Sequence, residues 1–111
     1  MSLPETTDAT FAADVLASDL PVLVEFTADW CPPCRMIAPV LERIAADHAG
    51  RLKVVALDVD TNPKTTLAYQ VLGMPTMALF VGGEIAARML GARPRTAILR
   101  DIEPHLPAAV A

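Results

Sequence analysis

The sequence predicts an α/β domain in which a mixed β-sheet is covered by helices on both faces. Short apolar runs typical of buried strands, at 22–26 and 52–58, alternate with segments of helical periodicity. Such alternation requires parallel strands joined by right-handed crossovers. Two further apolar runs, 76–81 and 85–90, flank a Gly-Gly pair and therefore predict an antiparallel hairpin at an edge of the sheet.

Length and composition favour a single domain over residues 1–111, because 53% apolar content suffices for one core. Residues 1–6 are expected to be weakly ordered or an edge strand, and 107–111 a tail. A net charge of −4 without a Lys/Arg cluster argues against nucleic-acid or membrane partners. No apolar run reaches the roughly 18 residues of a membrane span. The start lacks a signal-peptide pattern, which predicts a cytoplasmic protein.

The first half of the chain predicts two helices around a central strand. Thr7 or Asp8 is expected to cap a helix that buries three apolar residues, Phe11, Val15 and Leu16. A proline opens the strand at 22–26. The next helix is expected to bend at Pro39 and to end near Gly50, with one apolar face formed by Ile37, Val40, Leu41, Ile44 and Ala45.

The second half predicts two shorter helices in addition to the strands. Asn62 and Pro63 are typical of a helix N-terminus, and that helix is expected to end near Val71. Pro94 begins the final helix and Pro104 ends it. Its core-facing residues are expected to be Ala97, Ile98 and Ile102.

Two cysteines, Cys31 and Cys34, lie between the central strand and the long helix. Their spacing allows a disulfide across a very small ring. A thiol at a helix N-terminus has a lowered pKa, because unpaired N–H groups and the helix dipole favour the thiolate. Trp30 offers a flat surface beside the sulfur. Pro32 and Pro33 fix the backbone φ angle at the first positions of the helix, where the missing N–H groups would have no helical partner in any case. The pattern indicates a redox-active dithiol.

Two other interpretations of the cysteines stay open at this point. They could be inert buried thiols, or half of a metal site. A mononuclear site needs more ligands, and His48 and His105 lie at the end of a helix and in the tail. A dimer that binds one metal ion with four cysteines is a further alternative.

The segment from Val22 to Pro39, which includes Cys-Pro-Pro-Cys, closely resembles the strand, active site and kinked helix of the thioredoxin family. Asp58-Val-Asp-Thr-Asn-Pro63, Gly73-Met-Pro-Thr76, Gly82-Gly-Glu84 and Gly91 are similar to later landmarks of that family. The resemblance covers residues from about 8 to 106 and implies the thioredoxin fold, with a central mixed sheet of four to five strands.

The resemblance implies a chemical role for each cysteine. Cys31 is expected to be the exposed nucleophile that attacks a substrate disulfide, and Cys34 the residue that resolves the mixed disulfide. No cofactor is expected beyond the redox-active Cys31–Cys34 disulfide, and no metal. The implied partners are disulfide-containing proteins and a separate thioredoxin reductase that supplies electrons from NADPH, and the chain is expected to be a monomer.

The resemblance also implies a substrate-binding surface. Pro75 is expected to follow a cis peptide bond and to lie against the cysteines. The Met74 backbone would pair with an extended substrate segment. The expected apolar docking rim consists of Trp30, Gly73, Met74, Pro75, Gly91 and Ala92.

Glu25 stands in the apolar central strand, so we expect it to be buried with a raised pKa. Our hypothesis is that it deprotonates Cys34, a role that an aspartate usually has in the family. The alternative is a glutamate turned to the sheet edge and paired with a surface cation. Ala56 occupies the place of the usual lysine, and Lys53 should point to the opposite face of its strand.

Pro32 replaces a glycine that is usual in the family, which predicts a stronger reductant. The substitution removes an N–H near the Cys31 sulfur, and the stiff Pro-Pro pair reduces the entropy lost on ring closure. Two other functions are alternatives to a general disulfide reductase. One is a thiol–disulfide protein dedicated to a single pathway, and the other is a docking module without turnover.

Overall fold

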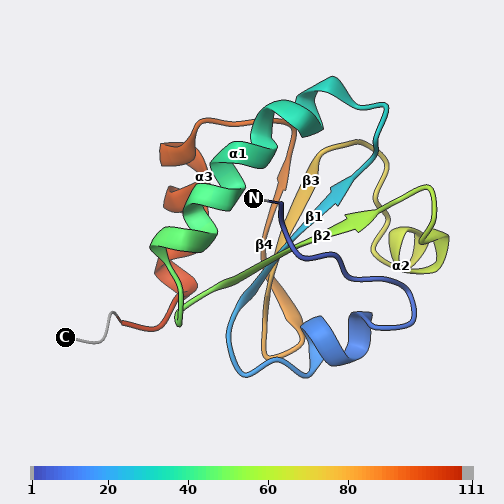
Figure 1. The fold of residues 1–111 in the computed structure, drawn as a ribbon. Coiled ribbons are helices and arrows are strands. Elements are labelled where there is room, and N and C mark those ends of the chain that lie inside the picture. Colours follow the sequence, from blue (N-terminus) through green and yellow to red (C-terminus); the bar gives the residue numbers. More distant parts are fainter. Residues whose placement is uncertain (1, 109–111) are drawn as a thin grey trace.

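The computed structural model describes residues 2–108 and contains one four-stranded mixed sheet with the strand order β2-β1-β3-β4. β1 pairs with β2 in parallel and with β3 antiparallel, and β3 pairs antiparallel with β4. Figure 1 shows helices on both faces of this sheet. The elements in chain order are η1 (Ala12–Leu16), β1 (Val22–Thr27), α1 (Pro32–Asp47), β2 (Lys53–Asp58), α2 (Pro63–Ala68), β3 (Thr76–Val81), β4 (Glu84–Leu90), α3 (Arg95–Ile102) and η2 (Glu103–His105).

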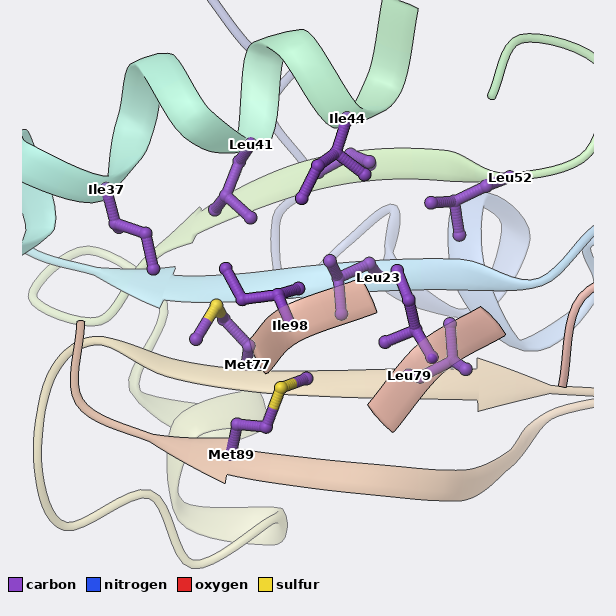
Figure 2. Packing of buried hydrophobic residues seen from close by; sticks show 11 residues of the cluster. Leu23, Ile37, Leu41, Ile44, Leu52, Met77, Leu79, Met89 and Ile98 are labelled. Carbon is purple, nitrogen blue, oxygen red and sulfur yellow. The ribbon is translucent and has the colours of Figure 1, made fainter. Parts of the chain in front are cut away.

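One face of the sheet is covered by α1 and α3, which lie together in Figure 1. The apolar stripe predicted for the long helix packs here, and α1 continues through Pro39. Figure 2 shows these side chains interleaved with those of the strands. The buried residues of this core are Leu23, Ile37, Leu41, Ile44, Leu52, Val54, Met77, Leu79, Met89, Ile98 and Ile102.

The other face is covered by η1 and by the segment around α2. Its centre is a trio of aromatic rings, Phe11, Tyr69 and Phe80, whose centroids lie 5.2–5.5 Å apart in tilted and edge-to-face arrangements. These arrangements are favourable because the electron-rich face of one aromatic ring attracts the electron-poor edge of another. This packing attaches α2 and the loop after it to the sheet, and that loop leads directly into the active site.

The N-terminal segment differs from the sequence expectation. The helix at its end is a π-helix over Ala12–Leu16 that begins after Phe11, and Asp8 does not cap it. Thr7 does cap the turn that leads into this helix: its hydroxyl accepts a hydrogen bond from the backbone N–H of Thr10 at 3.2 Å, and its carbonyl accepts one from the N–H of Phe11 at 2.8 Å. The N–H of Thr6 donates to the carbonyl of Ala56, and the N–H of Ala56 donates to the carbonyl of Pro4, both at 2.9 Å. These bonds cover the free edge of β2.

Most other predicted elements are confirmed within one to three residues. The hairpin between β3 and β4 turns through Gly82 and Gly83, at φ angles of 60° and 85° that favour glycine. Of the predicted tail 107–111, residues 109–111 lie outside the described part of the chain. Within residues 2–108, no helix is long and apolar enough to cross a membrane.

Candidate active site

Cys31 and Cys34 form a disulfide at the N-terminus of α1, with their Cα atoms 5.3 Å apart. Cys31 is the N-cap residue, and its sulfur accepts a hydrogen bond from the backbone N–H of Cys34 at 3.2 Å. Pro32 and Pro33 occupy the first two helical positions and have no N–H to donate. The structure thus places the dithiol where the positive end of the helix dipole favours a thiolate.

The expected exposure of Cys31 is wrong for this oxidised state. Cys31 is 3% exposed, and Cys34 is 2% exposed. Both side chains pack against Ala28, with Val59 and Met74 beside them. These apolar contacts therefore accompany the burial of both cysteines in the disulfide form.

That loop carries the predicted cis-proline, since the Met74–Pro75 peptide bond is cis in the structure. The carbonyl of Pro75 accepts a hydrogen bond from the N–H of Gly91 at 2.8 Å, and the hydroxyl of Thr76 donates to the carbonyl of Gly73 at 2.6 Å. The first bond ties the loop to the residue that follows β4, and the second ties Gly73 to the first residue of β3. Gly73, Met74, Pro75 and Gly91 of the predicted rim are therefore neighbours.

Trp30 directly precedes Cys31 in the chain, and Ala92 directly follows Gly91. Trp30 is 61% exposed, and its indole N–H donates to a carboxylate oxygen of Asp60 at 2.8 Å. Sequence reasoning did not predict a role for Asp60, although it lies in a segment already singled out by the resemblance. Ala92 lines a shallow cavity of about 220 Å³ together with Met36 and Val40.

Glu25 lies inside the protein rather than at a sheet edge, because β1 is a central strand. It is 2% exposed, and its Oε2 accepts no hydrogen bond from the described residues. Burial raises the pKa of Glu25 to about 7. Glu25 and Cys34 line the same cavity of about 320 Å³. The cavity therefore connects a carboxyl group that can exchange a proton near neutral pH with the second cysteine.

The residues around Glu25 agree with the expected strand geometry. Ala56 of β2 lies directly opposite Glu25 in the parallel register and lines the same cavity. Lys53 points to the other face of β2, where its Nζ donates to the carbonyl of Asp14 at 3.2 Å. No ammonium group of the described residues therefore forms an ion pair with Glu25.

The described residues contain no group of three or more His, Cys, Asp or Glu side chains arranged to hold a metal ion. His48 is buried at the end of α1, where its Nδ1 lies 2.8 Å from the carbonyl oxygen of Ile44. His105 lies in η2. Met77 and Met89 are core residues, and their sulfur atoms lie between the sheet and the helices in Figure 2.

Comparison with known proteins gives a consistent match over nearly the whole chain. The family model described as Thioredoxin matches residues 2–104. A thioredoxin of Mycobacterium bovis is 50% identical over 103 residues, which cover 93% of this chain and 89% of that protein. A thioredoxin of Synechocystis is 45% identical over 103 residues, which cover 93% of this chain and 96% of that protein.

A further relative is a bifunctional thioredoxin reductase/thioredoxin of Mycobacterium leprae, 52% identical over 103 residues. The match covers 93% of this chain but only 22% of that protein. The disulfide at a helix N-terminus, the Met74 side chain packed against it and these matches lead to one conclusion. The chain belongs to the thioredoxin family and is a thiol–disulfide oxidoreductase.

Proposed function

We propose that the protein is a general reductant of protein disulfides with Cys31-Pro-Pro-Cys34 as its active centre. The observation that carries this proposal is the Cys31–Cys34 disulfide at the start of α1, with Met74, the residue before the cis-proline, packed beside it. This arrangement supplies a nucleophile at the positive end of a helix and a second thiol within reach of it.

The proposed reaction begins with reduced protein. The Cys31 thiolate attacks one sulfur of a substrate disulfide, displaces the other sulfur as a thiolate and forms a mixed disulfide. The Cys34 thiolate then attacks the Cys31 sulfur, which breaks the mixed disulfide and releases the second substrate thiolate. Two electrons pass to the substrate, and the protons lost by the two cysteines balance those taken up by the two substrate thiolates.

Glu25 is the proposed proton acceptor for Cys34. This role is supported by the cavity that both residues line and by the pKa of about 7 that burial gives Glu25. A general base works best when its pKa lies near the operating pH. In Glu25→Gln, resolution of the mixed disulfide should slow and lose its dependence on pH near neutrality. An unchanged rate of resolution would contradict the role.

The substrate is proposed to bind as an extended segment beside the Met74 backbone. Extended peptides bind to exposed backbone groups through main-chain hydrogen bonds, and side-chain pockets add specificity. The proposed apolar rim consists of Trp30, Gly73, Met74, Pro75, Gly91 and Ala92. The exposure of Trp30 and Ala92 and the 2.8 Å bond from the N–H of Gly91 to the carbonyl of Pro75 support this arrangement.

We further propose that the protein works in the cytoplasm as one domain and a monomer. A thioredoxin reductase would reduce the Cys31–Cys34 disulfide with electrons from NADPH. Support for such a reductase comes from the Mycobacterium leprae relative, whose name joins the two activities.

Reduction of insulin disulfides with dithiothreitol tests the proposed function. The wild type should accelerate the reaction, and Cys31→Ser should not. A docking module without turnover would instead show the same rate for both proteins. Coupling to thioredoxin reductase and NADPH then separates a general carrier, which the reductase recharges, from a protein dedicated to one pathway.

A further inference from the structure

Arg88 of β4 makes two hydrogen bonds to the backbone at the end of α2. Its Nη1 donates to the carbonyl of Tyr69 at 2.6 Å, and its Nη2 donates to the carbonyl of Gln70 at 2.9 Å. Tyr69 is the C-cap residue of α2, where carbonyl groups lack helical partners and positive charge is favoured. The planar guanidinium thus spans two successive carbonyl groups that would otherwise have no helical donor.

Gln70 has a backbone conformation that most residues avoid. Its φ is 53°, the one positive value at a non-glycine residue in the described part of the chain. The amide N–H groups on either side of this turn are also bonded, because Gln70 donates to Leu67 at 3.0 Å and Val71 donates to Thr66 at 3.0 Å. Arg88 therefore adds two charge-assisted bonds where the chain turns out of α2.

The residue that follows the same strand holds the other end of this loop. After Gln70 the chain runs to the cis-proline, where the carbonyl of Pro75 accepts the N–H of Gly91. Between these two attachments, Leu72 is 95% exposed, and Gly73 lies so close to Leu90 that an added Cβ would meet its Cδ1 at 3.3 Å. The loop 70–75 is thus attached at both ends, to Arg88 of β4 and to Gly91, the residue that follows β4.

We propose that Arg88 is a positioning residue for the substrate-binding loop. By fixing the carbonyl groups of Tyr69 and Gln70, Arg88 sets the path of residues 71–74, and so the place at which the Met74 backbone meets a substrate protein. This inference rests on the proposed function, because it assigns a substrate-binding role to Met74. Arg88 does not contact the sulfurs, so its loss affects binding of extended substrates and leaves the thiol chemistry unchanged.

Kinetic measurements separate binding from chemistry. Reduced protein is mixed in single-turnover experiments with one of two oxidants. One is insulin, whose disulfides lie in a polypeptide chain, and the other is hydroxyethyl disulfide, which has no peptide segment to bind beside the Met74 backbone. In Arg88→Ala we expect the half-saturating insulin concentration to rise by about fivefold, with the maximal rate and the reaction with hydroxyethyl disulfide unchanged. Arg88→Lys keeps the positive charge but loses the planar guanidinium that donates to two carbonyl groups at once. Its half-saturating insulin concentration should therefore lie between those of the wild type and Arg88→Ala.

Arg100→Ala on α3 is the matched control, because it removes the same charge from an exposed arginine on the other face of the sheet. It should behave like the wild type in both reactions. Equal half-saturation for insulin in Arg88→Ala and Arg100→Ala would overturn the proposal. A parallel loss with both disulfides would also overturn it, because the defect would then lie in the thiol chemistry.

Hydrogen exchange supplies a readout that does not depend on turnover. The bonded N–H groups of Gln70 and Val71 should exchange roughly tenfold faster in Arg88→Ala than in the wild type or Arg100→Ala. Unchanged exchange at both residues would show that Arg88 does not hold the loop. If the wild type failed to reduce insulin, the proposed function would fail, and exchange would still decide whether Arg88 fixes this turn.

Discussion

The backbone N–H of Cys34 donates a hydrogen bond to the sulfur of Cys31 across 3.2 Å. The two helical positions between them are prolines, so Cys34 is the first residue of α1 that can donate to that sulfur from its backbone. A thiolate at Cys31 is therefore stabilised by fewer N–H groups than at a helix N-terminus without prolines. This lack of donors destabilises the reduced form relative to the disulfide.

Pro32→Gly should make the protein a weaker reductant. The substitution restores one N–H near the Cys31 sulfur and loosens the ring in the reduced state. A hydrogen bond worth about 1 kcal/mol corresponds to roughly 20 mV for a two-electron couple. We expect the reduction potential, measured by equilibration with glutathione, to become less negative and the pKa of Cys31 to fall. A more negative potential in the variant would contradict this account.

Glu25 should make the stability of the protein depend on pH. Burial raises its pKa from 4.5 to about 7, so the folded state binds more protons than the unfolded state between these values. The free energy of unfolding should therefore fall by up to about 3 kcal/mol as pH rises through this window. Urea denaturation of Glu25→Gln should show no such fall. The exposed Glu84→Gln serves as the control and should behave like the wild type.

Ala56→Lys should lower the pKa of Glu25 toward its ordinary value of 4.5. The new ammonium group would share a cavity with the carboxylate, and a nearby positive charge favours the ionised form. Titration of the Glu25 carboxyl group by carbon NMR measures this change. Lys53→Ala is the control, since Lys53 points to the opposite face of β2 and its loss should leave the titration unchanged.

Asp8→Ala should destabilise α2, although the two lie far apart in sequence. Desolvation raises the pKa of Asp8, but the backbone N–H groups of Thr65 at 2.8 Å and Lys64 at 3.1 Å outweigh this and lower it below 3.8. The stabilisation is thus present above pH 3.8 and is lost as pH falls further. At neutral pH we expect Tm to fall by about 5 °C.

The control for Asp8 is Asp19→Ala, which removes the same charge from an exposed residue before β1. Its Tm should stay close to that of the wild type. The difference in Tm between wild type and Asp8→Ala should also narrow in acid, as the carboxylate becomes protonated. Equal Tm values for both variants at neutral pH would show that Asp8 does not cap α2.

The strands and α1 could be predicted from the sequence because their signals are local. The apolar stripe from Ile37 to Ile44 identifies a helix face, and Gly82-Gly83 identifies a turn, because each signal lies within one element. The cis bond at Pro75 came from the resemblance to a family instead. X-Pro bonds are rarely cis, so composition alone gives no reason to expect one there.

Other features depend on residues that meet only after folding. Thr7 or Asp8 was expected to cap the first helix, but the carboxylate of Asp8 accepts from Thr65 at the start of α2, 57 residues further along. The bond from Trp30 to Asp60 and the two bonds from Arg88 are similar cases, since nothing local marks those partners. The burial of Cys31 was missed for the same reason, because the Val59 and Met74 side chains packed beside it are distant in sequence.

Trapping of the mixed disulfide tests the central claim most directly. Oxidised insulin is mixed with reduced Cys34→Ser or with reduced Cys31→Ser, and covalent adducts are measured by mass spectrometry without reductant. We predict that Cys34→Ser accumulates an adduct through Cys31, because no thiol remains to resolve it, and that Cys31→Ser accumulates little. An adduct that forms through Cys34 in Cys31→Ser, with none in Cys34→Ser, would contradict the assignment of Cys31 as the nucleophile.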